Sequence, residues 1–574
     1  MCLHETPHAD VPEETARCAR AAFRRGSPYL RLRDAFGPLF ADAQFRSLFP
    51  RRGRAAEAPW RLALVTLLQF AEGLSDRQAA DAVRARLDWK YVLGLELSDP
   101  GFDFTLLSDF RQRLLAQGAE RLLLETLLAR FREVGLIPLR GTQRTDATHV
   151  EAQVRELNRL ELVGETLRHA LQVLAQVAPG WLREQADPAW VERYDRPCNE
   201  WRLPKRPEER EALARQIGED GFRLLMAVVQ AREAADAGAA WQWLGQVPAV
   251  ETLRQVWVQQ FFREEREEPP STGRAEGEAR PRWVCGWRTK EDLPPSQTAL
   301  CSPYDPEARF AKKRETTWVG YKVHVTETCE TAGPLLITDV ETTTATAGDP
   351  EALAPIQARL AAQQLLPGRQ VADSGYISGS EIVRSEEEYG VELLGPPQGD
   401  RGWQARAGAG FALADFAIDW EAQRVRCPGG RESAHWEERA GRSGPNVLVR
   451  FAAADCRECP CREACTRAKS GGRRLTLQRE AQHAAVTQLR EQVRTGALAV
   501  AYAVRAGIEG TISQAVGSCG LRRSRYRGMQ KVTLQHIFTA AGLNLRRVAD
   551  WLAALPRHQV RRGAFARLMA ATPA

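Results

Sequence analysis

The chain has 574 residues, too many for one ordinary domain, and 44% of them are hydrophobic and 27% charged. This composition excludes disordered, collagen-like and membrane-spanning proteins, because the longest apolar run, from Leu62 to Ala71, is too short to cross a bilayer. The net charge of +7 is modest for this length and by itself indicates no partner.

The N-terminal part of the chain is predicted to be helical. Its first residues are acidic and lack the apolar core of a secretory signal, so we expect a cytoplasmic protein whose twelve cysteines are thiols or metal ligands. Residues 28–140 have helical patterns, with one helix from Pro59 to Gly73 and a second that begins at Ser75 with a capping box to Gln78. The pair resembles a DNA-binding helix-turn-helix, but a plain helical hairpin has the same pattern, and both interpretations stay open.

Residues 141–150 begin a mixed pattern of strands and helices that a long insertion interrupts. The insertion, 151–281, is helical for most of its length and ends in a charged stretch rich in Pro and Gly at 264–281, which is typical of a linker or exposed loop. From 282 to 395 strands alternate with helices, and one short strand ends at Asp373. The pattern predicts an α/β fold whose sheet combines both parts.

The remaining sequence is predicted to be irregular at first and then helical. Residues 396–497 lack a clear period and contain a cluster of cysteines. Its five members are Cys427, Cys456, Cys459, Cys461 and Cys465. Four of them would suit a structural Zn²⁺, with free thiols as the alternative. Residues 498–555 are predicted to be helical, and 556–574 form a basic tail. Residues 520–574 together hold eleven Arg or Lys and one acid. Such a basic stretch suits the binding of a polyanion, but basic tails also occur merely for solubility.

Three carboxylates are the candidate catalytic residues. Asp146 lies within a predicted strand, and Asp373 lies at the C-terminal end of another, where active-site residues of α/β sheets often occur. Glu509 lies on a helix whose same face carries Tyr502 and Arg505. Two strand aspartates and one helix glutamate suit a two-metal phosphoryl-transfer site, since Mg²⁺ prefers oxygen ligands. Each acid alone could equally be a turn, loop or surface residue.

Several segments carry a resemblance to a known family. The run from Arg505 to Gln514, followed by Gly520 to Gly528, closely resembles the C-terminal catalytic segment of DDE transposases from bacterial insertion sequences. Further segments resemble the same family in the same order, namely those from Phe45 to Leu114, Thr145 to Val150, Trp318 to His324, Val371 to Tyr376 and Ile418 to Pro428. The sequence is most similar to the group numbered eleven-eighty-two, over about residues 30–555.

The resemblance implies a ribonuclease H-like catalytic core with Asp146, Asp373 and Glu509 as an acidic triad that binds Mg²⁺ or Mn²⁺. Related families have a Tyr, Arg, Glu and Lys signature, and its first three places fall on Tyr502, Arg505 and Glu509. We therefore expect Tyr502 and Arg505 to bind DNA phosphate or to orient the catalytic glutamate.

The last place of this signature departs from the family. It falls on Val516, so Arg522 or Arg525 would have to replace the missing lysine. We expect Arg522, Arg523 and Arg525 to contact DNA phosphates close to the active site, with pairing to acids of the protein itself as the alternative.

The family's cysteine pattern selects four of the five clustered cysteines and leaves Cys461 as the extra one. We expect these four to hold a structural Zn²⁺: Cys427, Cys456, Cys459 and Cys465. The predicted architecture is thus α/β, with a ribonuclease H-like mixed sheet, an N-terminal helical DNA-binding domain at 28–140, a helical insertion and a zinc-knuckle insertion.

The function implied by the resemblance is that of a transposase. It would cleave double-stranded DNA at the terminal inverted repeats of its own element and join the freed 3′-OH to target DNA, as a homo-oligomer when two ends are paired. The alternatives are a DNA-binding regulator or an inactivated transposase without nuclease activity, and a metal-dependent nuclease that only cuts. The intact triad argues against an inactivated copy.

Overall fold

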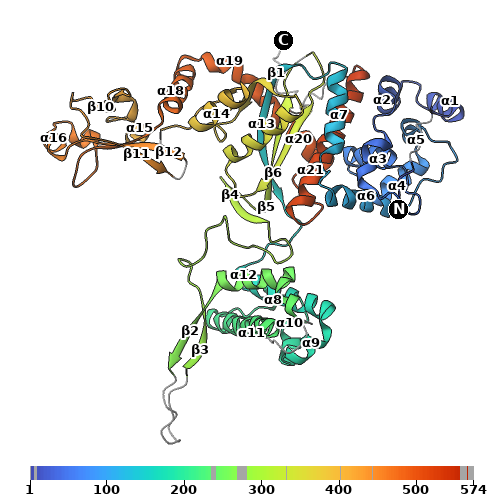
Figure 1. Cartoon of the computed structure of the whole chain (residues 1–574), viewed down its shortest axis with the longest axis horizontal. Coiled ribbons are helices and arrows are strands. Elements are labelled where there is room, and N and C mark those ends of the chain that lie inside the picture. The colour runs from blue at the N-terminus through green and yellow to red at the C-terminus, as the bar shows by residue number, and fades with distance from the viewer. Residues whose placement is uncertain are drawn as a thin grey trace, which may run out of the picture.

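The computed structural model describes residues 2–4, 10–233, 241–267, 281–330, 332–400, 402–441, 444–555 and 565. Figure 1 shows a central sheet with the N-terminal helices on one side, a small β-containing unit on the other and a helical insertion below. This mixture of sheet and helices agrees with the predicted α/β class. None of the helices within the described ranges is long and apolar enough to cross a membrane.

The N-terminal region is helical, as predicted. Its elements are α1 (Glu13–Ala22), α2 (Pro28–Phe36), η1 (Asp42–Leu48), α3 (Pro59–Glu72), α4 (Asp76–Ala85), α5 (Leu87–Leu93), α6 (Thr105–Ala116) and α7 (Leu122–Glu133). The helix predicted from Pro59 ends where Gly73 takes the left-handed conformation, with φ 70°. The Ser75 hydroxyl accepts the Gln78 backbone N–H at 3.3 Å, which confirms the predicted capping box.

The N-terminal helices share a single hydrophobic core with the sheet and the C-terminal helices. Helix α21 (Met529–Leu552) packs between α3 and strand β6 (Ile337–Thr344), and its Phe538 meets Phe70 edge to face at 5.4 Å. Helix α3 is consequently buried on nearly all sides. The predicted boundary at residue 140 therefore does not separate two cores, because α21 packs between the N-terminal helices and the sheet.

The central sheet has six strands. They are β1 (Arg140–Glu151), β4 (Arg309–Lys313), β5 (Thr316–Thr328), β6, β7 (Pro367–Ala372) and β8 (Glu392–Leu394). Their order is β4-β5-β1-β7-β8, and β6 also pairs with β5. Strand β5 is antiparallel to β1, β4 and β6, whereas β1, β7 and β8 are parallel neighbours. The sheet thus joins β1 to strands more than 150 residues away, as the interrupted pattern predicted.

Short helices complete this part of the chain. They are η4 (Asp349–Ala352), α13 (Leu353–Ala362) and α14 (Gly379–Tyr389), followed later by α19 (Ala497–Ala503), η6 (Val504–Ala506) and α20 (Gly507–Cys519). The helical face predicted to carry Tyr502, Arg505 and Glu509 is therefore interrupted by the tighter turn of η6. Ile508 and Ile512 of α20 are buried against the sheet.

The insertion after β1 has its own hydrophobic core, which includes Trp181, Trp190 and Trp257. It contains α8 (Arg159–Val177), α9 (Pro179–Gln185), α10 (Ala189–Tyr194), η2 (Glu200–Arg202), α11 (Pro207–Glu233), η3 (Gln242–Gln246), α12 (Pro248–Gln260), β2 (Phe261–Glu267) and β3 (Pro281–Trp287). The prediction of a linker or loop at 264–281 was wrong at both ends, because β2 and β3 form an antiparallel ladder. The charged residues Arg263, Glu264 and Glu265 of this ribbon are exposed, so this part of β2 has no alternation of apolar residues and its sequence resembles a loop. Residues 268–280 lie outside the described ranges.

Residues 396–497 are more regular than predicted. They form α15 (Trp403–Ala407), η5 (Leu413–Asp415), β9 (Ala417–Asp419), β10 (Arg424–Arg426), β11 (His435–Gly441), β12 (Gly444–Arg450), α16 (Ala453–Arg457), α17 (Arg462–Cys465), β13 (Arg474–Gln478) and α18 (Glu480–Thr495). Strands β11, β12 and β13 make a small sheet with its own core. Its inward residues alternate with polar ones over only a few positions, a short period-two signal between glycines. The basic tail, 556–574, lies outside the described ranges except for residue 565.

Candidate active site on the central sheet

The two candidate aspartates lie next to each other where β7 ends beside the middle of β1. The last register pair between the two strands is Thr145 with Ala372, so Asp146 within β1 and Asp373 directly after β7 are the residues that follow. The Asp146 side chain accepts the Ala147 N–H, and Asp373 accepts the Gly375 N–H, each at 2.8 Å. Residues 227 positions apart in sequence thus meet at the C-terminal end of β7, a place where active-site residues of α/β sheets often occur.

Glu509 reaches this site through Arg505. The Arg505 guanidinium binds the Asp146 carboxylate and, at 2.8 Å, Oε1 of Glu509 one helical turn further on. The Asp146 side chain is almost buried, whereas the Glu509 side chain is 69% exposed. Arg505 therefore links an acid of the sheet to an acid of α20, and the exposed glutamate borders solvent from which a substrate can approach.

Asp146 and Asp373 repel each other, and the repulsion affects the pKa of Asp146. Burial raises the pKa of the Asp146 carboxyl, Arg505 opposes this shift, and the Asp373 charge adds to it. The pKa of Tyr502 is raised by burial, with Arg505 lowering it and Asp373 raising it. Carboxylate oxygens gathered in this way fit a hard divalent cation. Within the described ranges, however, no three His, Cys, Asp or Glu side chains converge closely enough to hold a metal ion.

A fourth carboxylate, Asp349, borders the same site and was not among the candidates from the sequence. A Cβ on Gly375 would lie 2.7 Å from Oδ2 of Asp349 and 2.9 Å from Oδ1 of Asp373, so only glycine fits between the two acids. The Lys322 ammonium binds Oδ1 of Asp349 at 2.6 Å. The available signal in the sequence was the position of Asp349 shortly after β6, a strand of the same sheet.

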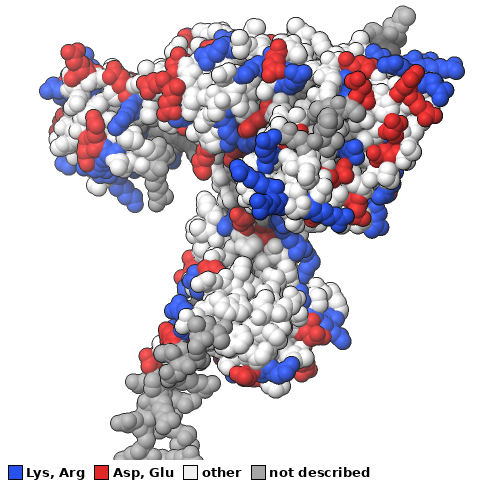
Figure 2. All heavy atoms as spheres, turned by 45° about the vertical axis from the view of Figure 1, so that its right-hand side comes forward, with Lys and Arg blue, Asp and Glu red and all other residues white. Residues whose placement is uncertain are grey.

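The three candidate arginines after α20 have different surroundings. Arg522 donates to the Thr148 hydroxyl at 2.9 Å, and Thr148 lies two residues beyond Asp146 on the same face of β1. Arg523 is exposed, and its backbone bridges to Glu151 at the end of β1. On the face drawn in Figure 2, Lys and Arg side chains gather where the insertion leaves the body of the protein.

Arg525 points away from these two, into the N-terminal helices. Its guanidinium donates to the Leu74 carbonyl at 3.1 Å and lies over the Phe70 ring at 5.0 Å. These contacts give Arg525 a role within the fold, which was the alternative considered for this segment. Sequence distance from Glu509 could not distinguish Arg525 from Arg522, because the chain turns between them.

Four cysteines surround a small cavity of about 30 Å³ in the unit built on β11–β13. They are Cys427, Cys456, Cys459 and Cys465, whereas Cys461 is exposed. Burial raises the pKa of the Cys465 thiol, Arg473 opposes this shift, and the three other thiols add to it. Cys456 Sγ also accepts the Arg473 backbone N–H at 3.4 Å. The residues are neighbours, but in the described chain they do not form a group arranged to hold a metal ion.

Two comparisons with known families bear on these sites. Residues 426–549 match the family described as Transposase DDE domain, and residues 17–113 match the family described as Transposase domain (DUF772). Both matches support a DDE transposase. No curated protein and no solved structure matches the chain.

The two matched ranges lie in the N-terminal and the C-terminal parts of the chain. The Transposase DDE domain match contains Arg505 and Glu509 together with the clustered cysteines, and the other match covers α3 and α4. They support an enzyme of the nuclease and transposase class, which acts on DNA and generally uses a divalent metal. The curled mixed sheet with many helices fits a DDE transposase.

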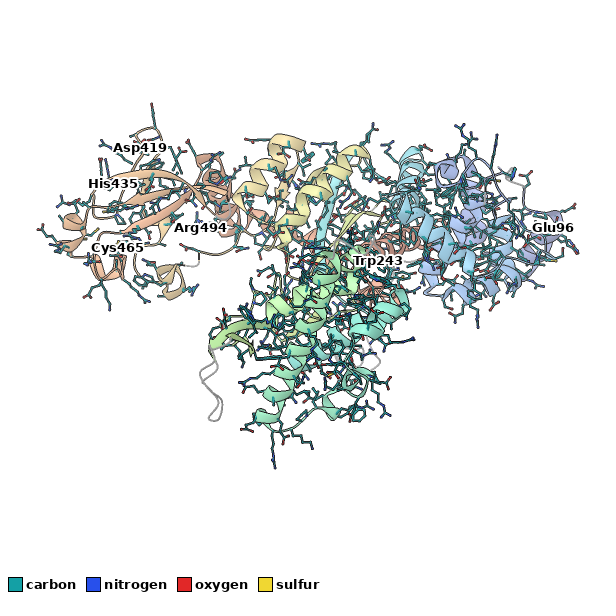
Figure 3. The ribbon with its side chains drawn as sticks, turned by 60° about the horizontal axis from the view of Figure 1, so that its bottom comes forward. Glu96, Trp243, Asp419, His435, Cys465 and Arg494 are labelled. Atoms are coloured by element: carbon teal, nitrogen blue, oxygen red, sulfur yellow. The ribbon has the colours of Figure 1, made fainter. Side chains whose placement is uncertain are left out.

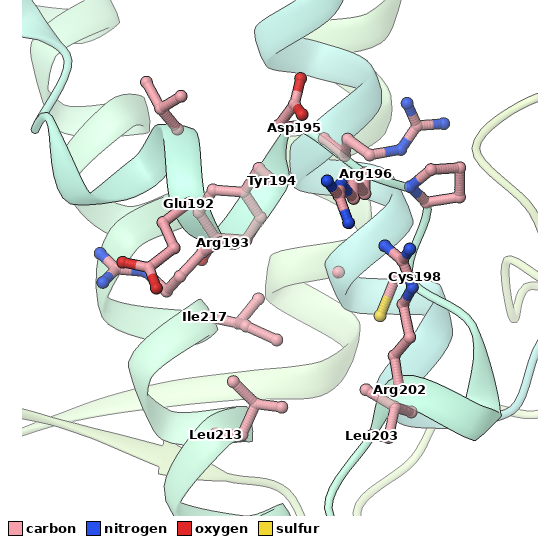
Figure 4. A pocket seen from close by; sticks show the side chains of 14 residues that line it. Glu192, Arg193, Tyr194, Asp195, Arg196, Cys198, Arg202, Leu203, Leu213 and Ile217 are labelled. Atoms are coloured by element: carbon pink, nitrogen blue, oxygen red, sulfur yellow. The ribbon is translucent and has the colours of Figure 1, made fainter.

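The helical insertion lies outside both matched ranges and contains a separate cavity of about 530 Å³. Figure 4 shows Arg196 and Arg202 beside Cys198 at one side of this cavity and Ile217 on another. Arg193 at its edge is paired with Asp220 at 2.9 Å. The lining residues, from 164 to 217, all come from the insertion, so this cavity is separate from the acidic site on the central sheet.

Proposed function

We propose that the protein is an insertion-sequence transposase, of the group numbered eleven-eighty-two, that cleaves DNA at the ends of its own element and joins the freed ends to target DNA. The observation that carries the proposal is the meeting of Asp146 on β1 with Asp373 directly after the adjacent strand β7, while Arg505 joins Glu509 to Asp146. The mixed sheet, in which β1 is antiparallel to β5 and parallel to β7, supports the ribonuclease H-like core that the resemblance implies.

Asp146, Asp373 and Glu509 would hold Mg²⁺ or Mn²⁺, which when bound supplies the positive charge that activates the attacking oxygen and stabilises the leaving one. The Gly375 N–H fixes the Asp373 carboxylate, and the Ala147 N–H fixes that of Asp146. Water attack on the end phosphodiester breaks the bond to the 3′ oxygen and frees a 3′-OH. In the second step this hydroxyl attacks a target phosphate, so that one phosphodiester forms as another breaks.

Arg505 and Tyr502 would bind the scissile phosphate, since Arg505 contacts Asp146 and Glu509, and Tyr502, whose pKa is raised by burial and by Asp373, lies near the acids. Arg522 and Arg523 would contact the DNA backbone next to the site. Arg525 is not among these phosphate contacts, because its guanidinium is engaged by the N-terminal helices. The basic tail and the N-terminal helices would grip the terminal inverted repeats, in at least a dimer when two ends are paired.

The four neighbouring cysteines would hold a structural Zn²⁺ in the unit built on β11–β13. The donor set fits, because four thiols line one small cavity and a backbone N–H already points at Cys456. This unit lies at the opposite end of the molecule from the N-terminal helices, as Cys465 and Glu96 in Figure 3 illustrate. The zinc would therefore stabilise the unit and take no part in strand cleavage.

The proposal is tested with purified protein, a labelled DNA fragment carrying the sequence that flanks its gene, and a supercoiled target plasmid. We expect cleavage at the fragment end and joining to the plasmid, both dependent on Mg²⁺ or Mn²⁺. A protein that binds the fragment but neither cuts nor joins would be the DNA-binding regulator or inactivated copy. Cutting without joining would identify a nuclease, so either result would overturn the proposal.

The arginines after α20 allow a prediction with a built-in control. Replacing Arg522 and Arg523 together by Gln should weaken binding to end DNA and flatten the dependence of log K on log salt by about 0.9 per lost phosphate contact. Arg525→Gln should leave this slope unchanged but lower the Tm, because it removes the contacts to Leu74 and Phe70. Salt titrations of binding and thermal unfolding measure both effects. An unchanged slope in a folded Arg522/Arg523 double variant would exclude phosphate contact.

A further inference from the structure

The helix that carries Glu509 rests on a buried cluster of charged side chains. The Glu327 carboxylate on β5 is fully buried and opposes Arg144 of β1 across the sheet. Arg144 binds it with Nε at 2.7 Å and Nη2 at 2.6 Å. Arg547 of α21 donates to the second carboxylate oxygen at 2.9 Å, and the Thr511 hydroxyl of α20 donates to the same oxygen at 2.6 Å.

The same cluster reaches β1 and α20, which carry Asp146 and Glu509, and η6, which carries Arg505. Nη1 of Arg144 donates to the Val504 carbonyl of η6 at 2.6 Å, next to Arg505. Arg547 also binds the Thr511 hydroxyl at 2.7 Å and the Gln514 side chain at 2.9 Å, both on α20. Arg144 itself lies two residues before Asp146, on the same face of β1. One buried carboxylate therefore joins β1, η6, α20 and α21.

Buried ion networks add little to net stability compared with a well-packed apolar core, but their directional bonds fix one arrangement. Here the arrangement fixed is that of α20 over β1. The first turn of α20 sits so close to Arg144 that a Cβ on Gly507 would lie 2.1 Å from Nη1. A small displacement of this turn would move Glu509 and Arg505 together relative to Asp146.

We propose that Arg144, Glu327 and Arg547 are positioning residues, which hold α20 and η6 so that Glu509 and Arg505 meet the aspartates of the sheet. The proposal rests on the proposed function for the role of the acids. It needs no contact of the three residues with DNA, since Glu327 is enclosed between the sheet and the two C-terminal helices.

Gly507→Ala tests the proposal with a matched control in the same helix, Gly517→Ala. Both changes favour helix formation, but a Cβ at Gly507 meets the Arg144 guanidinium, whereas one at Gly517 has no neighbour within 4 Å. We expect Gly507→Ala to lower the kcat of end cleavage about 100-fold with an unchanged KM for end DNA, as for a misplacement of about 1 Å. Gly517→Ala should cleave like the wild type.

A second pair of measurements identifies the cause. In an Arg144→Ala background the further change Gly507→Ala should have no additional effect, because the colliding guanidinium is gone. Glu327→Gln should also lower kcat while end binding remains, since an amide offers a donor where Thr511 and Arg547 already donate. Thermal unfolding and end binding show which variants are folded.

Hydrogen exchange provides a readout that does not depend on activity. We expect faster amide exchange across residues 504–512 in Gly507→Ala but not in Gly517→Ala. If the wild type neither cuts nor joins, the proposed function fails, and the exchange comparison still tests the positioning. Wild-type kcat and exchange in folded Gly507→Ala, equal losses in both glycine variants, or global unfolding of both Gly507→Ala and Glu327→Gln would overturn the inference.

Discussion

Asp146→Asn and Asp373→Asn should each abolish end cleavage while binding to end DNA stays nearly intact. Each change keeps the size of the side chain but removes the negative charge that a divalent cation requires. The charge supplied by such a cation is worth several kcal/mol in the transition state, so we expect a loss of about 1,000-fold or more. Gel-shift assays and single-turnover cleavage in Mg²⁺ measure the two quantities separately.

Asp419→Asn is the control for this prediction, since Asp419 lies in the distant β11–β13 unit (Figure 3). It should cleave at the wild-type rate. Asp146→Asn also removes one partner of Arg505, which keeps its bond to Glu509. A Tm measurement shows how much of any loss is structural. If a folded variant of either aspartate retained a tenth of wild-type cleavage, that aspartate would not belong to the triad.

Cys456→Ser should remove zinc from the protein and unfold the unit built on β11–β13. The hydrophobic core of this unit is small, and such small units commonly depend on a metal or disulfides. Binding of structural zinc is worth about 10–16 kcal/mol in small zinc domains, so its loss would destabilise the unit strongly. Metal analysis should find one zinc per wild-type chain, and hydrogen exchange should show β12 and β13 unprotected in the variant.

Cys461→Ser is the matched control, because Cys461 is exposed and does not line the cavity of the four other cysteines. It should keep both the zinc and the protection of the strands. Wild-type protein without stoichiometric zinc would disprove the proposed site. The same conclusion would follow if Cys456→Ser kept its metal and its fold.

Features set by neighbouring residues were predictable from the sequence. The helix that begins at Pro59, its end at Gly73 and the capping box of Ser75 with Gln78 depend on contacts within four residues. The same is true of the turn that places Asp373 at a strand end. A local pattern of this kind depends only on nearby residues and not on any other part of the chain.

Features set by distant residues were not predictable in the same way. Neither the pairing of α3 with α21 nor the different directions of Arg522 and Arg525 has a local signal, because each depends on where a remote segment packs. The strands around the cysteines were missed because their alternation is short and is broken by glycines.

The sequence by itself determined the helices of the N-terminal region, the strands next to Asp146 and Asp373 and the three candidate acids, since these follow from local patterns and spacing. The resemblance to a transposase family came from its motifs. Only the tertiary structure decided that β1 and β7 are parallel neighbours, that Arg505 bridges Asp146 and Glu509, and that Glu327 anchors the helix above them. Except for the bond between Arg505 and Glu509, these contacts join residues more than a hundred positions apart. They form because burial in one shared core brings the strands and helices together, which no period or spacing along the chain encodes.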